Sequence, residues 1–204
     1  MLTARTLLLL CCSGLVLTAF RSNDPLPIGS SLPHKTRALQ DVSGKTITLQ
    51  DKMGRNGLLV MFSCNTCPVV IDNQQRTAEI CRYASSRDIG VVLLNSNEGN
   101  RGSSESLEKM KAYAQAQGYA WPYAEDKNNV LADAFGATKT PECFLFDAQG
   151  KLIYHGAIDD NPQNESAVKR LHLKEAIDES VSGKDITVKV TRSVGCSIKR
   201  LAAN

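Results

Sequence analysis

Residues 57–68 of the chain are GLLVMFSCNTCP, and most of the predicted architecture follows from them. After Gly57 comes an uninterrupted apolar run, which is typical of a strand buried on both faces of a sheet. Cys64 and Cys67 follow that run, and Pro68 indicates the first turn of a helix, where proline is tolerated. The sequence therefore predicts two cysteines at a junction between a buried strand and a helix.

The pattern of apolar residues changes after this junction. Across residues 68–85 the apolar and small side chains recur at steps of three, four and seven, as they do on one face of a helix. Residues 89–94, IGVVLL, form a second buried run. A strand, a helix and a strand with short links form a βαβ unit, so we expect parallel strands joined by a right-handed crossover.

The remaining elements predict a mixed sheet. The hydrophobic pattern and the turn residues place two short strands around Ser43-Gly44, a helix at 105–117, a short strand at 119–123, a helix at 129–135, a hairpin around the turn at 147–150 and a final helix at 167–181. The predicted fold class is α/β, with a central mixed sheet flanked by helices and an N-terminal β-hairpin extension. Residues 95–104 form a polar loop, and its first residues, 95–98, leave the end of a parallel strand, which makes them a candidate substrate rim or a solvated loop.

Composition and charge narrow the function classes. Of 204 residues, 42% are hydrophobic and 22% are charged, which fits one soluble domain with a small appendage. The formal net charge is only +3, and this argues against a nucleic-acid partner.

The first residues suggest export. Arg5 precedes fourteen uncharged residues, 7–20 (LLLLCCSGLVLTAF), which are fewer than the roughly 20 that a membrane span needs and suit a secretory signal. We therefore expect a signal peptide at 1–22, with its cleavage site open, and one domain at 23–204 with a basic tail from about residue 184. The expected location is periplasmic or otherwise extracytoplasmic. An uncleaved anchor is the alternative, and it would be the only contact with a membrane.

The placement of Cys64 and Cys67 favours redox chemistry. At a helix start, free backbone N–H groups and the helix dipole stabilise a thiolate, the nucleophile of disulfide exchange. We expect Cys64 to be the more exposed, attacking sulfur, and Cys67 to resolve the mixed disulfide. A metal site and a purely structural disulfide are the alternatives. Tetrahedral zinc would need two further ligands, but the three histidines are scattered and no second close pair of cysteines follows the leader.

Thr140-Pro141 forms the second predicted part of the site. A proline that opens a strand is otherwise an edge marker. Beside a dithiol, it suggests a cis-proline loop that lies against the cysteines and leaves a groove for a substrate strand. Cys143 follows shortly after and is a candidate auxiliary thiol or a buried strand residue.

Cysteines 64, 67, 81, 143 and 196 follow the leader, which is an odd number for an exported chain. We interpret Cys81 as a core residue of the predicted helix. Cys196 is the second candidate auxiliary thiol, which we expect to form a disulfide in the oxidised protein.

Three stretches carry a family resemblance: FSCNTCP at 62–68, GATKTPECFLFDAQGKLIYHGAIDDNP at 136–162 and SVGCSIKRL at 193–201. Together they resemble the peroxiredoxin-like redoxin group of the alkyl hydroperoxide reductase/thiol-specific antioxidant family, over about residues 30–200. The resemblance implies a thioredoxin-like fold and a redox or antioxidant activity. True peroxiredoxins use a Pro-x-x-x-Thr/Ser-x-x-Cys motif. Aligning its cysteine on Cys67 puts Cys64 at the hydroxyl position and Val60 at the proline position, which argues against peroxidase activity.

These observations predict an exported thiol–disulfide oxidoreductase that exchanges electrons through Cys64 and Cys67 with a protein thiol or disulfide partner. No bound cofactor is required. The first alternative is a copper-handling protein resembling the Sco-type chaperones, in which His155 would join Cys64 and Cys67 as a ligand. Their cysteine pair has the spacing C-x-x-x-C, which differs from this one. The second alternative is a binding module whose dithiol only senses redox state.

Overall fold

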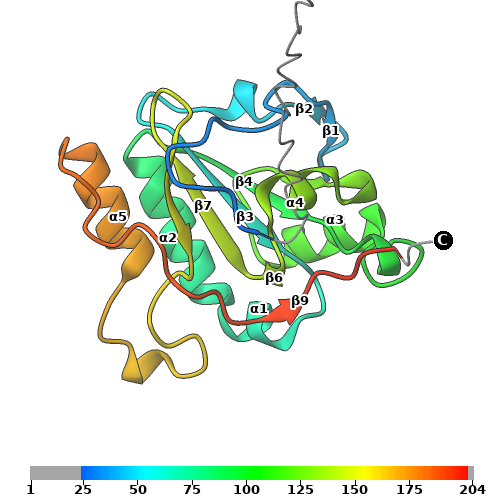
Figure 1. Cartoon of the computed structure of the whole chain (residues 1–204). Coiled ribbons are helices and arrows are strands. Elements are labelled where there is room, and N and C mark those ends of the chain that lie inside the picture. Colours follow the sequence, from blue (N-terminus) through cyan, green and yellow to red (C-terminus); the bar gives the residue numbers. More distant parts are fainter. Residues whose placement is uncertain (1–23, 202–204) are drawn as a thin grey trace, which may run out of the picture.

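The apolar run before the cysteines forms the middle strand of a five-stranded sheet, as shown by a computed structural model that describes residues 24–201 (Figure 1). In spatial order the strands are β5 (Tyr123–Glu125), β4 (Gly90–Asn95), β3 (Leu58–Ser63), β7 (Glu142–Phe146) and β8 (Leu152–Gly156). β3 is parallel to β4 and antiparallel to β7, and β7 is antiparallel to the edge strand β8. The predicted parallel pair and the predicted hairpin are therefore confirmed.

Within residues 24–201, five helices surround the sheet: α1 (Pro68–Asp72), α2 (Gln74–Ser86), α3 (Leu107–Ala116), α4 (Val130–Phe135) and α5 (His172–Val181). Single 3₁₀ turns lie at η1 (Gln50–Lys52), η2 (Glu98–Asn100), η3 (Lys127–Asn129) and η4 (Glu165–Ala167). The short strands β1 (Leu39–Gln40) and β2 (Thr46–Ile47) form the predicted N-terminal hairpin, and β6 (Lys139–Thr140) pairs antiparallel with β9 (Cys196–Ser197).

The alternation of side chains along β3 divides the core into two layers. Leu59 and Met61 pack on one face of the sheet with residues of α2, α3 and α5. Val60 and Phe62 pack on the other face with α4 and the β1–β2 hairpin. Burial on both faces explains why this strand is a continuous apolar run. The architecture is the α/β thioredoxin-like fold that the sequence predicts.

The single helix expected at residues 68–85 is two helices, α1 and α2, with a break at Asn73. The backbone of Asn73 has φ −95° and ψ 7°, and its side-chain amide donates to the carbonyl oxygens of Val69 at 2.7 Å and Pro162 at 2.8 Å. These bonds tie the break to the loop after β8, far away in the sequence, so the apolar periodicity of the helix does not reveal it.

Two other boundaries differ from the prediction by more than two residues. The last helix begins at His172 rather than at 167, because a 3₁₀ turn occupies residues 165–167. The short strand lies at Tyr123–Glu125 rather than at 119–123. Among residues 24–201, no helix has the length and apolar character needed to cross a membrane. The leader predicted at 1–22 lies outside the described residues.

Candidate active site

The two cysteines of the CNTC segment lie at the end of β3 and the start of α1. Cys64 directly follows the strand, whereas Cys67 is the N-cap residue of α1 and Pro68 is its first residue. Both side chains are buried, with exposed fractions of 1% and 3%. They form a small cluster with Val70, against which Val69 and Cys196 pack.

Thr140 contacts both sulfurs. Its hydroxyl shares a hydrogen bond of 3.3 Å with the Sγ of Cys64, and its backbone carbonyl accepts one of 3.4 Å from the Sγ of Cys67. The Thr140–Pro141 peptide bond is cis, which confirms the prediction of a cis-proline. The loop therefore lies on the dithiol, and Thr140 is the residue that contacts it.

The environment of the two thiols differs in a way that the sequence did not predict. Burial raises the pKa of Cys64 to about 11, which the hydrogen bond from Thr140 opposes and the charge of Glu105 reinforces. Burial also acts to raise the pKa of Cys67. It is outweighed by a hydrogen bond from the thiol of Cys196 and by backbone N–H groups at the start of α1, so that pKa is lowered. The structure thus favours a thiolate at Cys67, and the expectation that Cys64 is the more exposed sulfur is wrong.

A buried carboxylate holds the segment between the cysteines. Glu105, whose side chain is fully buried, accepts hydrogen bonds from the backbone N–H of Asn65 at 3.0 Å and from the hydroxyl of Thr66 at 2.8 Å. Asn95, the last residue of β4, donates to the same carboxylate at 2.6 Å. Glu105 therefore holds both residues between the cysteines in place.

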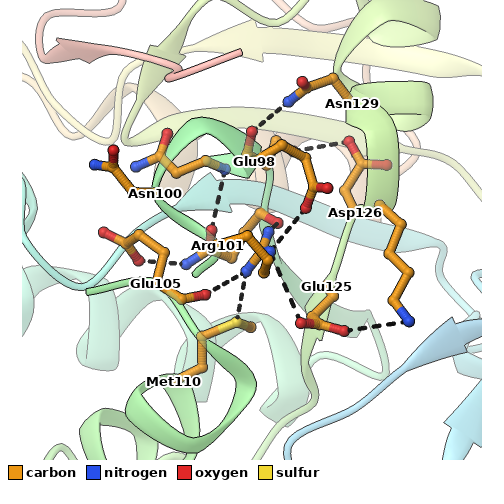
Figure 2. Close-up of polar contacts among 12 residues, drawn as sticks. Glu98, Asn100, Arg101, Glu105, Met110, Glu125, Asp126 and Asn129 are labelled. Carbon is orange, nitrogen blue, oxygen red and sulfur yellow. Dashed lines mark hydrogen bonds and ion pairs between the residues drawn. The ribbon is translucent and has the colours of Figure 1, made fainter. Parts of the chain in front are cut away.

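Arg101, in the loop at residues 95–104, holds Glu105 in place by a hydrogen bond to its backbone. Figure 2 shows Arg101 among Glu98, Glu105, Glu125 and Met110. Its guanidinium donates to the carbonyl oxygens of Asn95 at 2.7 Å and Glu105 at 2.6 Å, and it pairs with the Glu98 carboxylate at 2.7 Å. The first residues of the loop, 95–98, were predicted as a candidate substrate rim or as a solvated loop. In the structure, Arg101 of this loop holds the backbone of Asn95 and Glu105, and Glu105 in turn bonds to the segment between the cysteines.

Cys196 belongs to this site. It lies opposite Thr140 in the β6–β9 pair and packs against the dithiol cluster. Its side chain is half-buried, and burial together with the neighbouring Cys67 raises its pKa. The three sulfurs of Cys64, Cys67 and Cys196 therefore gather around one backbone position, Thr140.

Comparisons with known proteins identify the family of the chain. The sequence profile of the Redoxin family matches residues 22–171. The chain belongs to the Redoxin family. Thiol-disulfide oxidoreductase ResA of Bacillus subtilis is 25% identical to this redoxin over 153 residues, which are 74% of this chain and 80% of ResA.

Two solved structures are similar to the redoxin over most of its length. A hypothetical protein from Sinorhizobium meliloti 1021 is 33% identical with a TM-score of 0.80, and the alignment covers 88% of this chain and 98% of that one. An uncharacterized conserved protein from Geobacillus kaustophilus is 31% identical with a TM-score of 0.81, over 87% and 94% of the two chains. The redoxin is thus a redox protein of thioredoxin-like fold.

Cys143 does not join the dithiol of this redoxin. It lies on β7 opposite Met61, is fully buried, and packs in the core layer of α2 together with Cys81. Burial raises the pKa of Cys143 well above its usual range, so it is an unreactive thiol. Its prediction as an auxiliary thiol is wrong, and the alternative interpretation as a buried strand residue is confirmed.

The structure does not bring together the copper ligands of the alternative interpretation. The ring of His155 stacks on Phe144 in the sheet with centroids 5.7 Å apart. Within the described part of the redoxin, no three His, Cys, Asp or Glu side chains are grouped as metal ligands. The set of Cys64, Cys67 and His155 is therefore not assembled.

Sequence reasoning missed Glu105 as a site residue, because it was placed at the start of a helix. Its hydrogen-bond partners Asn65 and Thr66 lie 40 and 39 positions away, and Asn95 lies at the end of another strand. The only available signal was position, since Asn95 ends the strand parallel to the one that carries the cysteines.

Proposed function

We propose that this redoxin is an exported thiol–disulfide oxidoreductase that exchanges electrons with protein partners through Cys64 and Cys67. The contact of Thr140 with both sulfurs carries this proposal, because it places the dithiol at the strand position where a partner peptide would pair. The similarity to a protein named thiol-disulfide oxidoreductase supports the same class of activity. The apolar segment at 7–20 supports export.

The lowered pKa of Cys67 and its position at the start of α1 support Cys67 as the attacking thiolate. Its sulfur attacks one sulfur of the partner disulfide, a mixed disulfide forms, and the other partner sulfur leaves as a thiolate. Cys64 then loses its proton and attacks the Sγ of Cys67. The mixed disulfide breaks, the Cys64–Cys67 disulfide forms, and the second partner sulfur leaves. The partner gains two electrons and the redoxin loses two, and each step is reversible. No bound cofactor takes part.

Peroxide is a poor candidate substrate. The positions that hold a hydroxyl residue and a proline in the peroxidatic motif are Cys64 and Val60 here. Arg76, on α2, is not free to bind a peroxide. Its guanidinium pairs with Asp159 at 2.6 Å and donates to two backbone carbonyls. We therefore assign disulfides of proteins as the substrate class.

Reduction of insulin by dithiothreitol, followed by turbidity, tests this function. Cys67→Ser should abolish the catalysed rate, whereas Cys64→Ser should still attack and should accumulate mixed disulfides on Cys67. Cys81→Ala is the matched control, because Cys81 is a core residue of α2 outside the site. Full activity of Cys67→Ser would refute the proposed nucleophile. An inactive wild-type protein that still folds would refute the function itself.

A further inference from the structure

The C-terminal segment at residues 189–200, which we call the strap, crosses the dithiol from one edge of the sheet to the other. It first follows the edge strand β8, where the backbones of His155 and Thr191 are bonded at 3.0 Å. It then forms β9 against β6, and Figure 1 shows this red strand beside α1. The N–H of Ile198 donates to the carbonyl of Thr138 at 3.0 Å. The strap therefore occupies the backbone groups that the cis-proline loop would offer to a partner strand.

The backbone of the strap at Gly195 lies too close to Thr140 to leave room for a side chain. A Cβ atom on Gly195 would lie 2.1 Å from the Thr140 carbonyl oxygen, so only glycine fits there without a shift. Beyond the dithiol, Ile198 is buried in the core, and Gly99 donates to the carbonyl of Lys199 at 2.7 Å. The strap is thus anchored on both sides of the cysteines.

The register of the β6–β9 pair places Cys196, the cysteine of the strap, beside the dithiol. Cys196 lies opposite Thr140, which contacts Cys64 and Cys67 with its side chain and its carbonyl. The side chain of Cys196 packs against the cluster that contains Cys64 and Cys67. Of the five cysteines in the described residues, Cys196 is the only one that is partly exposed, and Cys81 and Cys143 lie in the core.

We infer that the strap is a tethered pseudosubstrate, in which Cys196 takes the place of a partner cysteine and forms a reversible disulfide with Cys67. This inference rests on the proposed function, because it assigns the partner groove to β6. It identifies the partner as an extended peptide that pairs antiparallel with Lys139–Thr140 and presents a cysteine opposite Thr140. Such a peptide must displace the strap.

The exchange needs no outside oxidant once the dithiol is oxidised. The thiolate of Cys196 attacks the Sγ of Cys67, the Cys64–Cys67 bond breaks, and the Cys67–Cys196 bond forms. Cys64 leaves as a thiolate and takes up the proton that Cys196 released, so no electron enters or leaves the protein. In the same way, Cys196 resolves a mixed disulfide between Cys67 and a partner. The product holds the strap covalently in the groove and blocks further partners.

Peptide mapping of the Cys64→Ser protein tests the disulfide directly. After oxidation with oxidised glutathione and alkylation of free thiols, we expect trypsin to release residues 56–76 joined to residues 193–199. In wild type, the joined pair should coexist with the form in which Cys64 and Cys67 are linked inside residues 56–76. Glutathione on Cys67 of the folded Cys64→Ser protein, with Cys196 free or itself glutathionylated, would overturn the inference.

The matched control moves the thiol by one residue. Cys196→Ser/Ser197→Cys, made in the Cys64→Ser protein, keeps the composition but puts the thiol on the opposite face of β9, because side chains alternate along a strand. The joined peptides should disappear. Equal cross-linking in this control would show that the reaction needs no register and would also overturn the inference. Urea unfolding midpoints verify that each variant is folded.

Opening of the strap gives a second readout. Gly195→Ala keeps all three thiols but forces the strap away from Thr140, so iodoacetamide should alkylate Cys67 several-fold faster than in wild type. An unchanged alkylation rate would contradict the pseudosubstrate role. Insulin reduction separates the two proposals. Cross-linking without insulin reduction refutes the proposed function alone, and insulin reduction without cross-linking refutes the strap inference alone.

Discussion

The carboxylate of Glu105 accepts a hydrogen bond of 3.0 Å from the backbone N–H of Asn65, although 40 positions separate the two residues. This bond connects the loop after β4 to the segment between the two cysteines. The dithiol is therefore held from two directions, by Glu105 on one side and by Thr140 on the other.

Glu105→Gln should change both the pKa of Cys64 and the stability of the fold. The charge of Glu105 raises that pKa, so its removal should lower the pKa from about 11. The NH₂ group of the new glutamine would face the donors that now bond to Glu105, which belong to Asn65, Thr66 and Asn95. We expect a loss of about 1–3 kcal/mol in the free energy of unfolding. Alkylation rates against pH and urea unfolding measure the two effects. Glu108→Gln, on the exposed side of α3, is the control and should change neither.

Thr140→Val tests the hydroxyl that bonds to Cys64. This hydrogen bond lowers the pKa of Cys64, so its loss should move that pKa above about 11 and slow the alkylation of Cys64 at any fixed pH. The backbone carbonyl that bonds to Cys67 is retained. Thr138→Val, two residues earlier, is the matched control. A Cys64 pKa that falls in Thr140→Val would contradict the assigned hydrogen bond.

Asp159→Asn should destabilise the fold strongly. Arg76 and Asp159 form an ion pair of 2.6 Å with side-chain exposures of 9% and 1%. Removal of the carboxylate leaves the buried charge of Arg76 with only backbone carbonyl partners, and loss of one partner of a buried ion pair costs about 3–5 kcal/mol. The urea unfolding midpoint measures this loss. Asp160→Asn should change stability by less than about 1 kcal/mol, because Asp160 is exposed and asparagine keeps an acceptor. Equal effects of the two variants would rule out the ion pair as the cause.

The stability of the fold should decrease at alkaline pH. The pKa of Cys64 is raised from 9.0 to about 11 in the folded state, so its contribution to stability is complete below about pH 9 and is lost as pH rises through 11. The expected loss is about 2–3 kcal/mol. Unfolding free energies measured between pH 8 and 11 test this, and Cys64→Ala should remove that part of the decrease. A wild-type stability that rises over this range would contradict the burial of a neutral thiol.

The strand–helix junction could be predicted because its causes are local. Burial on both faces gives β3 a continuous apolar run, and Pro68 marks the first turn of α1. The cis-proline loop followed from Thr140-Pro141 in the same way. The different pKa shifts of the two sulfurs could not be predicted, because the pKa of Cys67 depends on Cys196, which lies far away in the sequence.

Long-range hydrogen bonds account for the other differences. The break at Asn73 depends on the carbonyl of Pro162, and the role of Glu105 depends on Asn65. Each of these polar residues is unremarkable within its own stretch of sequence. A periodicity argument compares only neighbours in the chain, and therefore it extended one helix through Asn73 and placed Glu105 in another.

The pairing of β6 with β9 also protects the fold against association between molecules. Strand β6 has two residues, and β9 supplies its antiparallel neighbour. A strand without such a neighbour presents free N–H and C=O groups to other chains, which is a common origin of aggregation. A redoxin molecule whose strap is released also uncovers the apolar site of Ile198. Solubility at high concentration should therefore depend on residues 189–200, as reactivity does.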